Sequence, residues 1–498
     1  MSYRPFRVYT ARPADFHPCA LVLDHGAGVV KRRLTMKGSL MRIVRLVLAA
    51  LAVLVLGAIV YLVVAPPDLI RIGANYSAKI VCSNFFLAGR DPDEVLAVDV
   101  QAPGHPLLRL MRVDVDDSEG TVRAGLFGIA GGGVAVNRPG RGCTTLSGGD
   151  RDRLAVVDAP PQVAEPAPDV LWPEGGLVEP ADDAALAVVL DDPALVGPGM
   201  RAVVIVRDGR IVAERYGDGF GPDTPLLGWS VTKTVTAALI GRAVREGHME
   251  VAQPADFEGW TDSGRGAITI ADMMGMASDL AWNESYGSVS DVLRMLYLEP
   301  DMAGFAASMP LDAETSAGPG EVFEYSSGTT VMLARQWMDA LDDPAMAADY
   351  PRTALFGPLG MASAVMEMDA AGTFVGSSYM YATARDWARF GQFMAQRGVW
   401  NGRSLLPVGY VDWMVDPHPA SGGEYGRGQV WLRPANAWMG GDDPELPADG
   451  FYMNGHDGQS ISVIPSEDLV VVRLGLTPSD QRYKVANLID AVIAATAE

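Results

Sequence analysis

Two pairs of short apolar runs stand near the two ends of the C-terminal part of the chain. Residues 200–207 and 210–216 are rich in β-branched residues, and Asp208-Gly209 separates them. Residues 460–464 and 469–474 repeat this pattern around a short polar stretch. Apolar runs joined by a few turn residues are typical of β-hairpins, so we expect two hairpins here.

The chain between these hairpins has a different pattern. Residues 231–440 are rich in loops and carry apolar residues at helical spacing, and a closing helix is predicted over residues 479–497. Strands at both ends of a helical middle predict one antiparallel sheet flanked by helices, with a helical lobe inserted. The expected fold class for residues 181–498 is therefore α/β, of the α+β type.

Upstream, residues 46–65 form an apolar run without a charge, preceded by several Lys and Arg residues. Twenty helical residues span the ~30 Å hydrocarbon core of a bilayer, and a basic flank stays in the cytoplasm. We therefore expect a single-pass transmembrane anchor over residues 43–65, after a cytoplasmic tail over residues 1–42. A cleaved signal peptide is the alternative reading of this run.

Two segments lie between this anchor and the C-terminal domain. Residues 66–158 show short β-like runs, and we expect them to form a small extracytoplasmic region in which Gly131-Gly132-Gly133 is a turn. Residues 159–180 contain six prolines and predict an extended linker.

Composition and cysteine use narrow the function classes. A net charge of −22 argues against nucleic acid as a partner, because phosphate binding needs a basic face. The sequence contains no H-E-x-x-H, C-x-x-C or Walker A motif, so we expect neither a metal nor an organic cofactor. Cys19 falls in the tail, while Cys82 and Cys143 fall on the exported side, where disulfides persist. We predict a Cys82–Cys143 bridge, with two separate buried thiols as the alternative.

The strongest chemical signal is Ser230-Val231-Thr232-Lys233 at the start of an apolar helical stretch. The chain has only five lysines among 39 Lys and Arg residues. Residues i and i+3 share a helical face, so the Ser230 hydroxyl and the Lys233 amine can meet. A lysine with a lowered pKa can accept the proton of a serine, which arginine cannot do. The alternative is a helix-capping serine followed by an unrelated lysine.

Two further elements follow in order along the chain. Tyr325-Ser326-Ser327 begins 95 residues after Ser230, and His456-Asp457-Gly458 precedes the second hairpin. The ordered set S-x-x-K, Y-x-S and H-x-G resembles the class C β-lactamase-like serine hydrolases over residues 185–498. Stretches around Cys82 and Cys143 are similar to the 6-aminohexanoate-dimer hydrolase and penicillin-binding esterase branch. The resemblance implies a β-lactamase/transpeptidase-like fold.

The resemblance also implies a role for each matching residue. Ser230 corresponds to the acylated nucleophile, Lys233 to its activator, and Tyr325 to a general acid and base whose pKa must fall from ~10. The backbone N–H groups of Ser230 and Gln459 correspond to the oxyanion hole. The residues expected to bind substrate are Ser327, His456, Gly458 and Tyr286. Tyr286 begins a second Y-x-S run, and a partly buried loop aromatic is the alternative reading of it.

Two departures from the family pattern bear on the substrate. Serine replaces asparagine at Ser327, and histidine replaces the lysine of K-T-G at His456. A histidine is mostly uncharged at neutral pH and binds a carboxylate less well. We therefore predict a serine hydrolase of small-molecule esters or amides that acts through an acyl-enzyme, on the periplasmic side of the inner membrane. The alternatives are a D-alanyl-D-alanine carboxypeptidase or β-lactamase, and a non-catalytic penicillin-binding-like sensor module.

Overall fold

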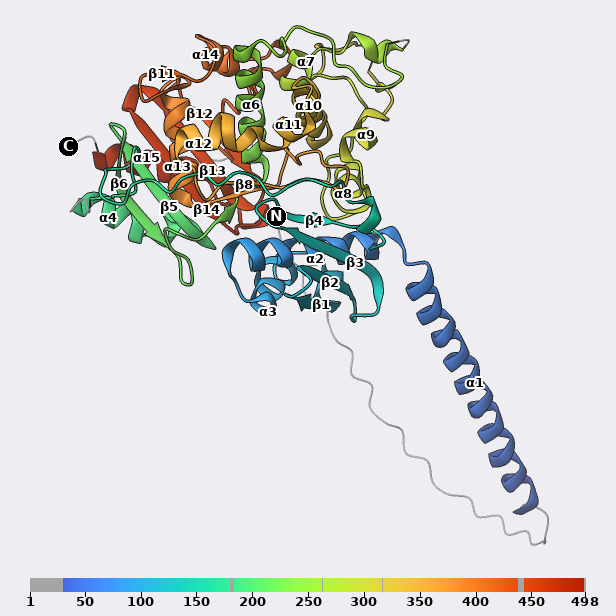
Figure 1. The fold of residues 1–498 in the computed structure, drawn as a ribbon. Helices are drawn as coiled ribbons and strands as arrows, with labels where there is room; N and C mark the ends of the chain where they lie inside the picture. The colour runs from blue at the N-terminus through green and yellow to red at the C-terminus, as the bar shows by residue number, and fades with distance from the viewer. Residues whose placement is uncertain are drawn as a thin grey trace, which may run out of the picture. The chain divides into compact units, whose positions relative to one another are not determined.

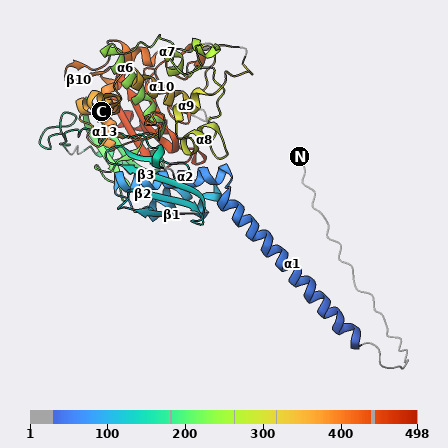
Figure 2. The ribbon, with the colours of Figure 1, turned by 45° about the vertical axis from the view of Figure 1, so that its right-hand side comes forward.

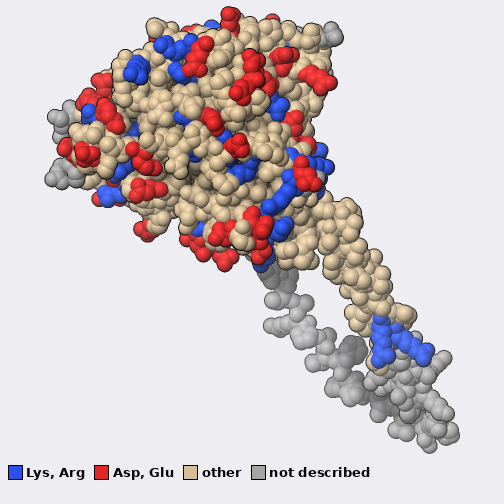
Figure 3. All heavy atoms as spheres, viewed as in Figure 1, with Lys and Arg blue, Asp and Glu red and all other residues tan. Residues whose placement is uncertain are grey.

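The N-terminal part of the chain is dominated by one long helix, α1 (Val30–Val64). A computed structural model describes residues 30–149, 151–179, 183–261, 263–315, 317–437 and 443–496, so Cys19 and most of the predicted tail lie outside the described residues. The stretch Leu40–Val64 is long and apolar enough to cross a membrane, and a signal sequence passes the same test. Its side chains are exposed except that of Leu62, and Figure 3 shows Lys or Arg only near the start of its described part.

The chain divides into two compact units after Tyr61, and the second unit, from Leu62 to Glu498, holds all the elements described below. It opens with helix α2 (Asp68–Ala88), which packs on a four-stranded antiparallel sheet of order β1-β2-β3-β4 (Figures 1 and 2). The strands are β1 (Met111–Asp116), β2 (Thr121–Leu126), β3 (Ala130–Arg138) and β4 (Gly142–Thr145). Short helix α3 (Pro92–Val95) and a 3-10 turn (Pro106–Leu110) connect α2 to the sheet.

The glycine triplet at residues 131–133 belongs to strand β3, so the expected turn is wrong. Gly131 and Gly132 do adopt the left-handed conformation, with φ of 103° and 57°. Gly133 has another function, because a Cβ there would lie 2.3 Å from the backbone of Ala74. The missing side chain lets α2 touch the sheet, which a local sequence pattern does not reveal.

Two buried links tie this region together and to the rest of the unit. The predicted Cys82–Cys143 disulfide is present and joins α2 to β4. Beside it, the Lys79 ammonium of α2 pairs with the Glu367 carboxylate, which also accepts the Cys143 N–H at 2.6 Å. Both side chains of this ion pair are almost fully buried. The region therefore packs into one core with the C-terminal domain.

The main sheet confirms the predicted antiparallel architecture. Its order is β12-β13-β14-β5-β6, and the central pairing places Val472 opposite Val204. Both predicted hairpins are present, and they lie side by side although one comes from each end of the domain. The strands are β5 (Met200–Arg207), β6 (Arg210–Tyr216), β12 (Phe451–Gly455), β13 (Gln459–Ile464) and β14 (Leu469–Gly475).

Helices cover both faces of this sheet (Figure 1). One face packs on α13 (Ala384–Ala395). The other packs on α4 (Ala184–Asp191) and on the C-terminal helix α15 (Val485–Thr496). The closing helix begins six residues later than predicted, after a 3-10 turn over Ser479–Gln481 that ends at Arg482 with a φ of 54°.

The second lobe is helical, as expected, and includes a small sheet of order β7-β9-β8. Its main elements are α6 (Thr232–Glu246), α7 (Ile270–Met274), α8 (Asp291–Leu298), α9 (Met302–Ala307), α10 (Ser327–Asp339), α11 (Pro344–Tyr350), α12 (Gly357–Leu359) and α14 (Tyr410–Val415), with β7 (Leu226–Leu227), β8 (Val365–Met366) and β9 (Met380–Ala382). The proline-rich segment before the domain is docked rather than free, because the Arg389 guanidinium donates to the Pro173 carbonyl at 3.1 Å.

Candidate active site

Ser230 stands at the junction of a tight turn and helix α6. A 3-10 turn over Trp229–Val231 leads directly into the helix, and Trp229 has a left-handed backbone with a φ of 48°. That conformation is rare for a bulky residue and is kept only where the surroundings enforce it. Here Gly228 is pressed against Trp387, where a Cβ would lie 2.5 Å from the indole. The strained turn leaves the Ser230 side chain partly exposed at the first turn of the helix.

The Lys233 ammonium lies on the same face one turn later and is buried, with 1% of its surface exposed. Its Nζ lies 3.1 Å from Ser230 Oγ, 3.0 Å from Ser327 Oγ and 3.1 Å from the Ser377 carbonyl oxygen. These three oxygens hold the amine in place. The structure therefore brings together Ser230, Lys233 and Ser327.

Burial lowers the pKa of Lys233 to about 8, against the opposing effect of the nearby Glu284 carboxylate. The neutral amine is then accessible near physiological pH, whereas an ordinary lysine holds its proton up to about pH 10. Lys233 thus has the position and the proton affinity of a general base for Ser230.

Glu284 is a site residue that the sequence analysis missed. Its carboxylate accepts the Ser327 hydroxyl at 2.5 Å and the Ser327 N–H at 2.9 Å, and the Trp282 indole N–H donates to it at 2.6 Å. It therefore fixes Ser327, which in turn contacts Lys233. Glu284 stands on a loop with no motif around it, and only its position two residues before Tyr286 gave any signal.

Tyr325 faces the same group of atoms from the start of helix α10. Ser326 caps this helix by accepting the Thr329 N–H at 3.1 Å, which places Tyr325 just before the helix and Ser327 in its first turn. Lys233 Nζ lies 4.8 Å from the centroid of the Tyr325 ring. The Y-x-S spacing is thus explained by one helix start.

The proton affinity of Tyr325 differs from the expectation. Burial raises the pKa of the Tyr325 phenol, and a hydrogen bond with Ser230 offsets only part of that rise. The phenol therefore keeps its proton near neutral pH in the free protein. The pKa is therefore raised and not lowered as expected, because burial outweighs the hydrogen bonds with Ser230 and Trp431.

The edge strand β12 closes the site from the opposite side. A Cβ at Gly455 would lie 2.4 Å from the Gly228 carbonyl oxygen, so glycine allows this strand to reach the turn before Ser230. Tyr452 exchanges both backbone hydrogen bonds with Trp431, on the side away from β13. Since N–H groups alternate between the two sides of an antiparallel strand, the His456 N–H also points away from β13.

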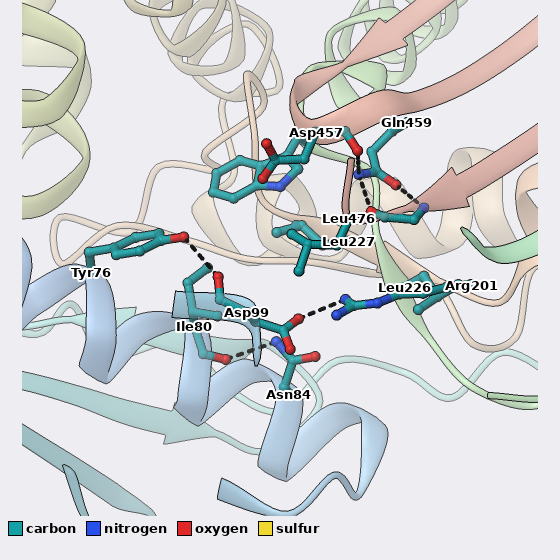
Figure 4. A pocket seen from close by; sticks show the side chains of 12 residues that line it. Tyr76, Ile80, Asn84, Asp99, Arg201, Leu226, Leu227, Asp457, Gln459 and Leu476 are labelled. Atoms are coloured by element: carbon teal, nitrogen blue, oxygen red, sulfur yellow. Dashed lines mark hydrogen bonds and ion pairs between the residues drawn. The ribbon is translucent and has the colours of Figure 1, made fainter. Parts of the chain in front are cut away.

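Gln459 lies elsewhere, which contradicts its predicted place in the oxyanion hole. It stands on the inner strand β13, and its amide donates to the Gly475 carbonyl at 2.6 Å (Figure 4). It lines a different small cavity, together with Asp99 and Arg201. The prediction placed Gln459 at the site because it follows the H-x-G motif. In the structure a three-residue turn at His456–Gly458 carries the chain away from Ser230 before Gln459.

Gly458 is likewise absent from the site. Its carbonyl accepts the Arg473 guanidinium at 2.9 Å, on the far side of the turn. The glycine that approaches the nucleophile is Gly455, three residues earlier. The correspondence with K-T-G therefore moves to Met453-Asn454-Gly455, and an apolar Met453 occupies the lysine position.

A cavity of about 280 Å³ opens above Ser230. The Tyr325 and Trp431 rings line one part of it, and their centroids lie 5.3 Å apart. The predicted substrate-binding residues Tyr286 and His456 line another part, as rings stacked at 4.8 Å. Ser327 is fully buried beneath the cavity, so it supports the reacting groups and does not line the pocket.

Substitution of Glu284 by glutamine is expected to change the pH dependence of the site. Only neutral Lys233 accepts a proton, so kcat/KM should rise with pH and level off above about 8. Removal of the Glu284 charge removes the interaction that raises the pKa of Lys233, so the rise should move to lower pH. Steady-state pH profiles measure this shift, with exposed Glu321→Gln as the control. An unmoved profile in Glu284→Gln would show that this carboxylate does not influence the titrating base.

Comparisons with known proteins find a matching family and a similar fold. The Beta-lactamase family model matches residues 193–494. The 6-aminohexanoate-dimer hydrolase of Paenarthrobacter ureafaciens is 27% identical over 311 residues, which cover 57% of this chain and 74% of that protein. A solved structure of a putative 6-aminohexanoate-dimer hydrolase from Bacillus anthracis has a TM-score of 0.52 at 21% identity, and covers 69% of this chain and 88% of its own. A putative β-lactamase from Bacteroides dorei DSM 17855 has a TM-score of 0.51 at 18% identity, covering 64% of this chain and 100% of its own. The two structures show a shared fold.

Proposed function

The chain belongs to the Beta-lactamase family, and we propose that it is a serine hydrolase that cleaves an ester or amide through an acyl-enzyme on Ser230. One observation carries this proposal. The buried Lys233 amine, with its pKa lowered to about 8, lies 3.1 Å from Ser230 Oγ beneath an open cavity. A serine beside an amine of low pKa is an activated nucleophile.

Acylation follows from these positions. Neutral Lys233 takes the proton of Ser230 as Oγ attacks the carbonyl carbon of the substrate. The Tyr325 phenol, which holds its proton near neutral pH, donates it to the leaving oxygen or nitrogen when the carbonyl bond to that group breaks. Proton transfer from the Lys233 ammonium restores the phenol. In deacylation the same groups activate water and return the proton to Ser230.

The negative charge on the carbonyl oxygen needs hydrogen-bond donors. We assign this function to the backbone N–H groups of Ser230, at the start of a helix, and of His456, at the end of the strand edge. His456 replaces Gln459 in the assignment, because it lines the cavity with Ser230 and its N–H points away from the sheet.

We further propose that α1 anchors the protein in the inner membrane and that the catalytic unit is periplasmic. The apolar length of α1 and the arginines near its start support the anchor, although a signal sequence shares these features. The Cys82–Cys143 disulfide supports an oxidising compartment.

A second candidate reaction, hydrolysis of cell-wall peptides or β-lactams, is favoured by one observation. Both substrates carry a carboxylate, and the Arg433 guanidinium lines the cavity. In the free protein Arg433 lies 3.5 Å from the Glu424 carboxylate, which competes for this cation. Met453 supplies no second positive charge, so we rank this reaction below ester and amide hydrolysis.

The test uses the full chain in detergent and its Ser230→Ala variant. We expect turnover of p-nitrophenyl butyrate, an ester without a carboxylate. A fluorophosphonate should add its mass to Ser230, and Ser230→Ala should show neither effect. Turnover confined to nitrocefin or D-alanyl-D-alanine peptides would establish the second candidate. Absence of every turnover and of the adduct would reduce the protein to a non-catalytic module.

A further inference from the structure

A second cavity of about 340 Å³ lies beside the first. It is an open hollow between the N-terminal region and the helical lobe. Leu69 and Ile72 of α2 and Leu107 of the following turn line one side, and Leu293 of α8 lines the other. The named walls are mainly hydrocarbon. The lining also includes polar groups, of which His105, Ser479 and Asp480 are exposed and Asp457 is half-buried.

The two cavities share a wall. Tyr286 and His456, stacked at 4.8 Å, line both the Ser230 cavity and this second one. Trp229, the residue before the nucleophile, also lines the second cavity and meets the His456 ring edge-on at 5.7 Å. A substrate with its carbonyl at Ser230 thus has a concave apolar space one ring pair away.

Tyr286 lies at the boundary between the two cavities, where a ligand that occupies both would pass. It is 45% exposed, although its ring stacks against His456, and it stands on a loop between Trp282 and α8. An aromatic ring offers apolar area at low conformational cost. The stack therefore forms a wall along which a hydrocarbon chain can lie.

We propose that the second cavity is a lobe of the substrate site that binds the linear apolar chain of an ester or amide. This inference rests on the proposed function, because it places the carbonyl of the same molecule at Ser230. It gives the N-terminal region a part in substrate choice, since α2 and residues 103–108 supply nine of the nineteen lining residues. Short-chain substrates use the Ser230 cavity alone, and long-chain substrates use both.

The size of the effect follows from burial of hydrocarbon. Each methylene removed from water contributes about 0.8 kcal/mol, which is about fourfold in affinity. Affinity should therefore keep rising with chain length after the Ser230 cavity is filled. A site that ended at the Tyr286–His456 stack would give a plateau.

The experiment compares two substitutions on one 3-10 turn. Leu107 lines the cavity, whereas Leu110 of the same turn is 38% exposed and does not line it. Leu107→Trp should fill the lobe and Leu110→Trp should not. Both are made in the full-length Ser230→Ala chain, in one detergent, so partition of ligand into micelles is common to both samples.

The ligands are the N-methyl amides of acetic, butyric, octanoic and decanoic acids, which bind without needing turnover. We expect affinity to rise by up to about fourfold per methylene in Ser230→Ala and with Leu110→Trp, and to level off beyond butyramide with Leu107→Trp. Isothermal titration measures it. Leu293→Trp on the opposite wall repeats the test if Leu107→Trp does not fold.

The proposal would be overturned if affinity depended on chain length equally in the two cavity variants, Leu107→Trp and Leu293→Trp, and in the control Leu110→Trp. A plateau at butyramide in the Ser230→Ala parent would also overturn it. Either result leaves ester hydrolysis untouched, because the parent enzyme can still cleave short esters. Conversely, if Leu107→Trp or Leu293→Trp abolishes the chain-length dependence, the second cavity binds the chain even if the protein shows no turnover.

Discussion

Replacement of Lys233 by arginine is expected to abolish acylation of Ser230 while the protein stays folded. Arginine keeps the positive charge at this position but cannot give up its proton. If Lys233 acts as a base, the loss in kcat/KM should match the ~10²–10⁴-fold usually lost with a general base. The rate of fluorophosphonate addition to Ser230 measures the acylation step directly.

A second substitution separates the possible functions of this lysine. Lys233→Met removes both charge and base, so a base-only function predicts equal losses in the Arg and Met variants. Near-normal activity in Lys233→Arg would show that the lysine acts as a fixed charge.

Tyr325→Phe should slow the hydrolysis of substrates with poor leaving groups, such as amides, more than that of activated p-nitrophenyl esters, because it removes the proposed proton donor. Circular dichroism should show native helix content in this variant and in both Lys233 variants.

Replacement of Lys79 by methionine is expected to cause the largest loss of stability. The change leaves the Glu367 carboxylate, which has no exposed surface, without its cation in the core between the N-terminal region and the C-terminal domain. Loss of one partner of a buried ion pair costs about 3–5 kcal/mol of unfolding free energy. Urea unfolding of the full chain measures the change.

A matched control and a double variant test the reason. The Arg294–Asp68 pair is also an ion pair at 3.2 Å, but both side chains are over a third exposed. Arg294→Met should cost about 0–1 kcal/mol. Lys79→Met with Glu367→Gln should regain most of the loss, because no unpaired charge is then left in the core and the glutamine oxygen can still accept the Cys143 N–H. A double variant as unstable as Lys79→Met would point to lost packing instead.

Much of the fold could be predicted from the sequence because its signals are local. The hairpins at 200–216 and 460–474 each carry a β-branched pattern around turn residues, and the pairing between them follows from packing two hairpins into one domain. Ser230 and Lys233 could be paired because i and i+3 spacing on a helix fixes their proximity.

The remainder of the site depends on distances that no local pattern contains. Glu284 reaches Ser327 across 43 residues of chain. The end of β12 determines which residues face Ser230. The H-x-G motif, taken from the sequence alone, placed Gln459 and Gly458 in the site. In the structure His456 and Gly455 occupy these positions. The raised pKa of Tyr325 depends on burial, which its motif does not encode.

The central sheet has a consequence for the protein during its synthesis. Strand β5 cannot pair with β14, and Gly228 cannot contact Gly455, until nearly all of the chain has been synthesised. Ser230, Lys233 and Tyr325 are all made earlier, yet one wall of their site belongs to the last fifty residues. A nascent chain, or one cut before β12, therefore carries Ser230 without Gly455 and His456 opposite it, and we expect such a chain not to hydrolyse substrate.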